Sequence, residues 1–277
     1  SVVQAVVSFL EQYWAPSDLA AFQAHFGLKN MPIAKLVGYN NPAPSAAGVE
    51  ASLDVDYLSG VPEYIPTWVW STNGTSANGN EPWLVFLDDL MAALNKQPGQ
   101  NFPSVFSMSY QDLEPSVPQS YATAVCQMFQ KLTMTGLTFV TGSGDWGVGC
   151  EPDMTGGSCT KFAPDFPSSC PYVTSLGGTY INSQNKEVNI YFSSGGFSNY
   201  FSRPSWQDAE VLPYLEKPSV KQLSKWFNTT GRAFPDVSTV STNFQVVYQG
   251  QIIPVDGTSA ATPTFASMVS ILNDYRK

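Results

Sequence analysis

Short apolar strands alternate with helical segments along most of this chain, and this alternation constrains its fold more than any other feature. Runs rich in β-branched and apolar residues predict strands, and longer segments with apolar residues on one face predict helices. Such alternation implies parallel pairing, so we expect an α/β fold with three layers and a mostly parallel central sheet. Ligands of such sheets lie beyond the carboxyl ends of the strands. The expected strands are 2–9, 33–38, 65–70, 105–109, 137–140, 172–176 and 244–248, and the expected helices are 17–26, 48–58, 82–94, 118–134 and 259–275.

Three stretches carry more local expectations. Ser17 or Asp18 is expected to cap the helix that follows it, because both residue types are common N-caps. Residues 189–206 hold several glycines and aromatic residues and are expected to be loop rather than strand. Residues 207–230 are expected to be partly helical and irregular.

Composition bounds the kind of protein. The chain has 277 residues, 43% of them hydrophobic, with no break in composition, so we expect one domain over 1–277. Only 13% of the residues are charged, and the formal net charge is -9. This acidic balance argues against a nucleic-acid partner and suits a protein that works at low pH. No apolar run has transmembrane length, so no membrane partner is expected.

The cysteines and sequons indicate an oxidising compartment. Cys126, Cys150, Cys159 and Cys170 form no Cys-x-x-Cys pair, and with a single histidine in the chain a zinc site is not expected. Three of the four crowd into a loop-like segment, which is typical of disulfide bonding. Four cysteines allow three pairings; the sequence does not choose among them, and we favour Cys150 with Cys159 and Cys126 with Cys170. Asn73 and Asn228 begin Asn-x-Thr sequons and are candidate glycosylation sites.

The Gly-Thr-Ser triplet at 257–259 is the first candidate for chemistry. It precedes a helix-like run, so it places the Ser259 hydroxyl at a helix N-terminus, where unpaired N–H groups favour developing negative charge. Such a position suits a nucleophile whose reaction produces an oxyanion. The alternative reading of Ser259 is a helix N-cap.

A base for this serine is not an obvious histidine. The sole histidine, His25, has no evident partner nearby and is interpreted as a structural or surface residue. Glu50 and Asp54 are spaced i,i+4, so their carboxyls would share one helix face, and repulsion between them would raise the pKa of one. Such a pair can act as a base under acidic conditions. The alternative is a solvated helix face; Asp56 cannot share the face of Asp54 and is given no role.

Asp145 is the fourth candidate. It follows the expected strand 137–140 in Ser143-Gly144-Asp145, at the edge where ligands bind. A protonated carboxyl there can donate a hydrogen bond to a tetrahedral intermediate. Ordinary turn chemistry is the alternative reading of Gly-Asp-x-Gly.

These motifs resemble the sedolisins, the serine-carboxyl peptidases, and most closely their tripeptidyl-peptidase I branch. The resemblance implies a subtilisin-like fold with Ser259 as nucleophile, Glu50 as base and Asp54 as the group that orients Glu50. It also implies that Asp145 stabilises the oxyanion. The segments that carry it, in the family's order, are 9–13, 47–54, 67–69, 143–145, 166–174, 195–199, 231–237 and 257–259.

The resemblance also implies partners and a compartment. Members of the family bind calcium through a segment beyond the serine helix, so the calcium ligands are expected beyond Lys277, with none in this chain. We expect a processed piece, without propeptide, signal peptide or C-terminal segment, and that segment is expected to stay bound as a separate light chain. The expected substrate is a peptide or protein, and the expected location is secreted or lysosomal.

Three functions compete at this point. The first is an acid-active peptidase, of tripeptidyl-peptidase or endopeptidase type, and the second is an inactive relative that binds peptides. The third, a histidine-dependent subtilisin, conflicts with the single histidine. Aromatic residues expected to line a substrate cleft are Trp68, Trp70, Trp146, Phe197 and Trp206.

Overall fold

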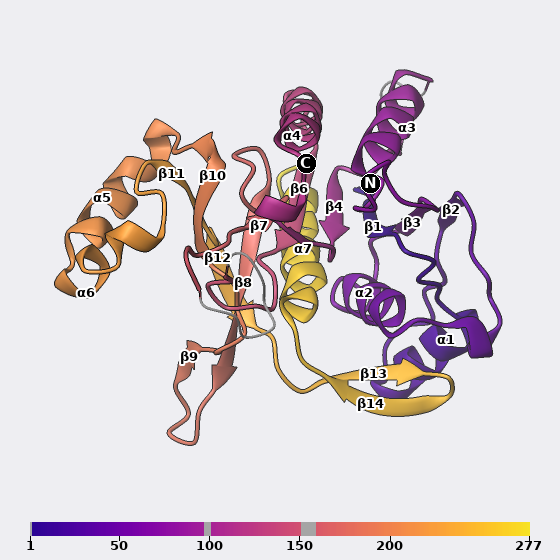
Figure 1. Cartoon of the computed structure of the whole chain (residues 1–277). Helices are drawn as coiled ribbons and strands as arrows, with labels where there is room; N and C mark the ends of the chain where they lie inside the picture. The colour runs from indigo at the N-terminus through magenta and orange to yellow at the C-terminus, as the bar shows by residue number, and fades with distance from the viewer. Residues whose placement is uncertain (1, 97–100, 151–158) are drawn as a thin grey trace.

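A central, mostly parallel sheet runs through the molecule (Figure 1). The computed structural model describes residues 2–96, 101–150 and 159–277, and within these the sheet has eight strands. Seven are parallel, in the order β12-β8-β6-β4-β1-β3-β2, and β9 pairs antiparallel with β8. The strands are β1 (Gln4–Ser8), β2 (Lys35–Val37), β3 (Thr67–Ser71), β4 (Val105–Met108), β6 (Thr138–Gly142), β8 (Thr174–Ile181), β9 (Glu187–Asn189) and β12 (Val237–Val240).

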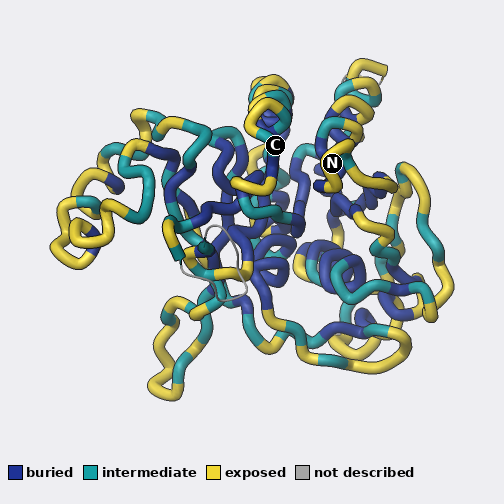
Figure 2. The backbone as a smooth tube through the Cα atoms, in the orientation of Figure 1, coloured by how far each residue is buried: buried dark blue, intermediate teal, exposed yellow. Residues whose placement is uncertain are grey.

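Helices cover both faces of this sheet. On one face lie α2 (Val49–Gly60) and α7 (Thr258–Tyr275), and on the other lie α3 (Trp83–Lys96) and α4 (Gln119–Thr133). The central strand β1 shows why both faces are needed, since all five of its residues are buried. Ala5 and Val7 pack with α3 and α4, whereas Val6 packs with α2 and α7. The expected three-layer fold is confirmed, and Figure 2 shows its buried interior in dark blue.

The first helix, α1 (Pro16–His25), is correctly expected but its cap is not. Its N-cap is Ala15, with Pro16 at the first helical position, and no side chain caps it. Asp18 instead accepts hydrogen bonds from the backbone N–H groups of Gln249 and Gly250, at 2.8 and 3.1 Å. The Asp18 side chain therefore satisfies two N–H groups of a distant turn instead of capping its own helix.

That turn joins β13 (Phe244–Tyr248) to β14 (Gln251–Val255), an antiparallel hairpin at the edge of the molecule. Both residues of the turn have positive φ, 51° at Gln249 and 76° at Gly250, as a two-residue hairpin turn of type I′ requires. Asp56, which received no role from the sequence, is buried beneath the hairpin and accepts the Val247 N–H at 3.4 Å. β14 was not expected from the sequence.

The expectation of loop at 189–206 is wrong. Residues Gly196–Ser202 form β10, which pairs antiparallel with β11 (Gly231–Phe234), and the register shifts between Phe197 and Ser202. This irregularity, together with the glycines, hides the alternation that identifies a strand. The segment 207–230 is partly helical as expected, with α5 (Asp208–Glu216) and α6 (Pro218–Lys221).

Two short strands and two disulfides connect segments that lie outside the central sheet. β5 (Asp112–Leu113) pairs with β7 (Asp165–Phe166). The favoured cysteine pairing is confirmed: Cys126 is bonded to Cys170 and Cys150 to Cys159, with Cα–Cα separations of 5.7 and 5.5 Å. Within the described residues, no helix combines the length and the apolar character that a bilayer crossing needs.

Candidate active site

The helix α2 carries the two candidate base residues. Glu50 lies in its first turn and Asp54 one turn later, so both carboxyls face the same side. Asp54 is fully buried, and one of its oxygens accepts a hydrogen bond from Ser109 Oγ at 2.7 Å. Ser109 directly follows β4, so the carboxyl end of the sheet supplies this contact.

Both carboxyls lie where their charged forms are disfavoured. The pKa of Glu50 is raised to about 7: burial and the nearby Asp145 raise it, while interactions with Ser259 and Ser109 oppose the rise. Burial and the neighbouring Glu50 raise the pKa of Asp54 well above its ordinary value. Two carboxyls this close cannot both ionise easily, so they titrate as a pair that holds one proton in common.

Ser259 lies at the start of α7, as the sequence predicts. Its side chain is 8% exposed, so it is held within the protein but remains reachable. Because α2 packs against α7 and the Ser259 hydroxyl interacts with the Glu50 carboxyl, the candidate nucleophile and the candidate base lie together. The N-terminal end of α7 adds partial positive charge at this point.

Asp145 faces the same helix end from the other side. It follows β6, and its Oδ1 accepts the Thr258 N–H at 2.7 Å, while the N–H of Gly144 donates to Thr258 Oγ1 at 3.2 Å. Partial enclosure raises the pKa of Asp145, and the hydrogen bonds from Thr258 oppose this rise. A Cβ at Gly257 would lie 3.1 Å from Asp145 Oδ2, so glycine leaves the space in front of that oxygen open.

This geometry specifies which oxygen of Asp145 carries a proton. Oδ1 already accepts a backbone N–H, so in the protonated acid the hydrogen resides on Oδ2. Oδ2 then becomes a hydrogen-bond donor beside the start of α7. The structure thus brings the four predicted site residues together from α2, the β6 loop and α7, whereas His25 is exposed at the end of α1.

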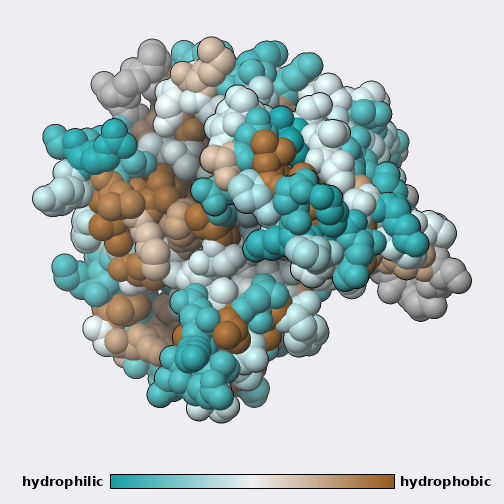
Figure 3. All heavy atoms as spheres, turned by 90° about the vertical axis from the view of Figure 1, so that its left-hand side faces the viewer, coloured by the Kyte–Doolittle hydropathy of each residue, from teal (hydrophilic) through white to brown (hydrophobic). Residues whose placement is uncertain are grey.

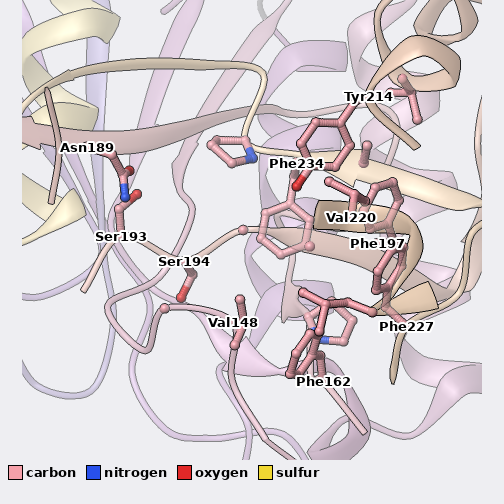
Figure 4. A pocket seen from close by; sticks show the side chains of 18 of the residues that line it. Val148, Phe162, Asn189, Ser193, Ser194, Phe197, Tyr214, Val220, Phe227 and Phe234 are labelled. Atoms are coloured by element: carbon pink, nitrogen blue, oxygen red, sulfur yellow. The ribbon is translucent and has the colours of Figure 1, made fainter. Parts of the chain in front are cut away.

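A cavity of about 720 Å³ lies beside this site (Figure 4). Gly147 and Val148, which closely follow Asp145, form part of its wall. Small polar side chains occupy one side of it, and aromatic and aliphatic side chains occupy the other. Figure 3, which views the molecule from the side of α5 and α6, shows apolar side chains gathered over this face. The apolar wall includes Phe162, Val211, Tyr214, Val220, Leu223, Phe227 and Phe234.

The aromatic residues expected in the cleft separate into three groups. Phe197 lines the cavity, as expected. Trp68 and Trp70 are buried in the core that faces α3 and α4, so their placement in the cleft is wrong. Trp146 and Trp206 are exposed, at 58% and 67%, and line no part of the cavity. Trp68 and Trp70 lie on β3, and this explains the two errors, because aromatic residues also fill central strands.

The structure adds detail on the sequons and on metal binding. Asn73 is exposed, but Asn228 donates its side-chain N–H to the Ser198 carbonyl at 2.8 Å, which engages the nitrogen that a glycan would need. Across 2–96, 101–150 and 159–277, no group of three or more His, Cys, Asp or Glu side chains could hold a metal ion. These residues do not fit a calcium site, so no chemical step is derived through calcium.

Comparison with known proteins gives consistent relatives. The chain is 38% identical over 276 residues to tripeptidyl-peptidase 1 of Dictyostelium discoideum, covering 99% of this chain and 43% of that protein. It is 41% identical over 280 residues to tripeptidyl-peptidase 1 of Mus musculus, covering 99% and 48%. The chain therefore spans about half the length of the curated relatives it matches. No protein-family model matches it.

Solved structures agree on the fold. Pseudomonas sedolisin, a serine-carboxyl proteinase complexed with two molecules of pseudo-iodotyrostatin, superposes with a TM-score of 0.73 at 21% identity, covering 99% of this chain and 75% of that one. A cold-adapted subtilisin-like serine proteinase superposes with a TM-score of 0.50 at 12% identity, covering 99% of this chain and 76% of that one. The subtilisin-like class of the fold and the resemblance that the sequence motifs indicated are both confirmed.

Proposed function

We propose that this chain, a homologue of tripeptidyl-peptidase 1 with the fold of sedolisin, is the catalytic part of an acid-active serine-carboxyl peptidase. One observation carries the proposal: Ser259, Glu50 and Asp145 converge at the N-terminus of α7. The chain offers no histidine to this site, so a carboxyl must act as the base.

The proposed reaction begins with attack by Ser259 Oγ on the carbonyl carbon of the scissile peptide bond. Glu50 removes the hydroxyl proton. Asp54, which accepts a hydrogen bond from Ser109, holds a proton in common with Glu50. The carbonyl oxygen becomes an oxyanion, which accepts a hydrogen bond from Asp145 Oδ2–H. Collapse of this intermediate breaks the C–N bond, and Glu50 returns the proton to the leaving amine. Water then hydrolyses the acyl-enzyme by the same steps.

The reactive form sets the pH range. It requires Asp145 to be protonated and the Glu50–Asp54 pair to lack one proton. When the base has the higher pKa, this form is a minor tautomer of the site, and its population is nevertheless highest between the two pKa values concerned. The pKa of Asp145 is raised from 3.8 and that of Glu50 is about 7, so we expect a bell-shaped profile with its maximum on the acid side of neutrality.

The cavity beside Asp145 gives the proposal a substrate preference. Its apolar wall suits a large aromatic or aliphatic side chain near the scissile bond, and Glu210 is the one charged residue among the described residues that line it. Whether cleavage releases tripeptides or cuts internally is decided by mass spectrometry of the products from one long peptide.

The proposal also includes a secreted or lysosomal location, a calcium site and a separate C-terminal light chain, all carried over from the family resemblance. A native polypeptide found by mass spectrometry to end at Lys277, with nothing bound to it, would refute the light chain.

The decisive test uses Ser259→Ala. We expect the unsubstituted protein to turn over a peptide at about pH 4 to 6 and the variant to lose that turnover by a factor of at least about 10³. Peptide binding with no turnover in either protein would instead support the alternative of an inactive, peptide-binding relative, which no observation favours at present.

A further inference from the structure

Asp165 is a buried carboxyl that the proposed mechanism does not use. It lies on β7 and is 0% exposed, and within the described part of the chain neither carboxyl oxygen has a hydrogen bond of ordinary geometry, although the Ser194 hydroxyl is close enough to interact with it. A buried carboxyl with so few partners is rare and calls for an explanation.

The surroundings of Asp165 place it behind the turn that carries Asp145. A Cβ built on Gly144 would lie 2.7 Å from both Cγ and Oδ2 of Asp165, and 2.8 Å from Ser194 Oγ. Asp165 and Ser194 therefore lie against the residue that precedes Asp145. Gly144 permits this close approach because it has no Cβ, and its φ of +105° is one that glycine adopts without strain.

Ser194 holds this turn on both sides of Asp145. Its N–H donates to the Gly144 carbonyl at 2.8 Å, and its Oγ accepts the Trp146 N–H at 3.0 Å. Because Oγ already accepts a hydrogen bond, the hydroxyl proton is available to the neighbouring Asp165 carboxyl. That interaction is favourable, since it lowers the pKa of Asp165.

The other groups around Asp165 keep it neutral in the acid range. Burial raises its pKa well above the ordinary value, and the carboxyls of Asp145, Asp112 and Glu114 act in the same direction, against the Ser194 hydroxyl. A neutral acid can occupy this position beside Asp145 without adding a second negative charge behind the developing oxyanion.

We propose that Asp165 and Ser194 are positioning residues, which hold the turn 143–147 so that Asp145 Oδ2 faces the developing oxyanion. The inference rests on the proposed function of Asp145. Asp165 touches no substrate in this arrangement, because it is fully buried and forms no part of the cavity wall. Ser194 does line the cavity, so KM is measured beside kcat to separate a substrate contact from a positioning effect. Its effect passes through Ser194 and Gly144 to Asp145.

The test compares four variants with the unsubstituted protein: Asp165→Leu, Ser194→Ala, the double variant and Asp165→Asn. For each, kcat and KM are measured with one peptide across the pH profile, and folding is checked by thermal unfolding. We expect Asp165→Leu and Ser194→Ala each to lower kcat about tenfold to a hundredfold with KM within about twofold, since they misplace an oxyanion donor. The kcat of the double variant should lie within about twofold of the kcat of the less active single variant, because both residues act through one contact.

Asp165→Asn is the matched control for charge. It keeps the size and a hydrogen-bond acceptor, so we expect kcat within about threefold of the unsubstituted protein and an unmoved alkaline limb. An alkaline limb displaced to lower pH would show that Asp165 is ionised and would overturn the inference. An unchanged kcat in Ser194→Ala would also overturn the inference. This variant leaves position 165 unaltered, so its result does not depend on whether the protein tolerates leucine there. Absence of turnover in the unsubstituted protein would instead refute the proposed function, and with it this inference.

Discussion

Raising the pH from acid to neutral should destabilise this chain, and Glu81 allows the effect to be measured at one position. Glu81 is 6% exposed and lies just ahead of α3. Burial and the neighbouring carboxyl of Asp112 together raise its pKa from 4.5 to about 8. Asp112 in turn accepts a hydrogen bond from Asn80 Nδ2 at 2.9 Å. The pair therefore folds with a proton on Glu81.

The sign follows from comparing folded and unfolded chains. The pKa of Glu81 is higher in the folded chain, so its contribution to stability is fully present below pH 4.5 and is lost as the pH rises to about 8. Each pKa unit of this interval corresponds to about 1.4 kcal/mol, so the free energy of unfolding that the pair contributes, and loses across the interval, is at most about 5 kcal/mol. That is comparable with the ~5–15 kcal/mol total stability of a folded domain. The buried carboxyls of Asp54, Asp56 and Asp165 change stability in the same direction.

Thermal unfolding at about pH 4.5, 6 and 7.5 measures the effect. We expect the Tm of the unsubstituted protein to fall across this series and that of Glu81→Gln to fall less, because the amide cannot ionise. The matched control is Glu216→Gln, whose side chain is 71% exposed and whose ion pair with Lys221 contributes little. It should follow the unsubstituted protein. A Tm that rises with pH, or equal slopes in Glu81→Gln and the unsubstituted protein, would refute the reasoning.

Two further predictions concern catalysis and covalent stability. Glu50→Gln should lower kcat by at least about 10²-fold with little loss of fold, because it removes the base but keeps its shape; retained turnover would exclude Glu50 from the mechanism. Replacing Cys126 and Cys170 with serine should lower the free energy of unfolding by about 4 kcal/mol, because the bond closes a loop of 44 residues. Urea unfolding measures this loss, and an unchanged midpoint would contradict it.

Much of the fold could be predicted because its signals are local. β1, β3, β4 and β6 are continuous apolar runs bounded by loops, so their sequences identify them as buried parallel strands. β10 could not be found in this way, since its glycines and its register shift obscure the period of two. Its pairing with β11 depends on residues 29 to 38 positions away, which no local window contains.

The residues of the site also differ in how far the sequence could identify them. Helix geometry places Glu50 and Asp54 on one face and made them candidates, and the resemblance to the sedolisins supplied their expected roles. Ser109, Asp165 and Ser194 were not, because serines and aspartates after strands are common and their roles depend on which strands end side by side. A usable signal existed for Ser109, which follows β4 next to the strand that precedes Asp145. Asp165 offered none, since its importance arises from burial against Gly144.

The acid chemistry that we propose for this chain and its expected stability at acid pH have one physical cause. A solvated glutamate is too weak a base to activate a serine, so burial must raise the pKa of Glu50 to about 7 before it can take the proton from Ser259. The same withdrawal from water keeps Asp165 neutral, and it raises the pKa of Asp145, which must remain a donor. Each of these groups disfavours ionisation, so the folded state becomes less stable as the pH approaches neutrality. A carboxyl-based site of this kind therefore favours both the proposed catalysis and the folded state at acid pH.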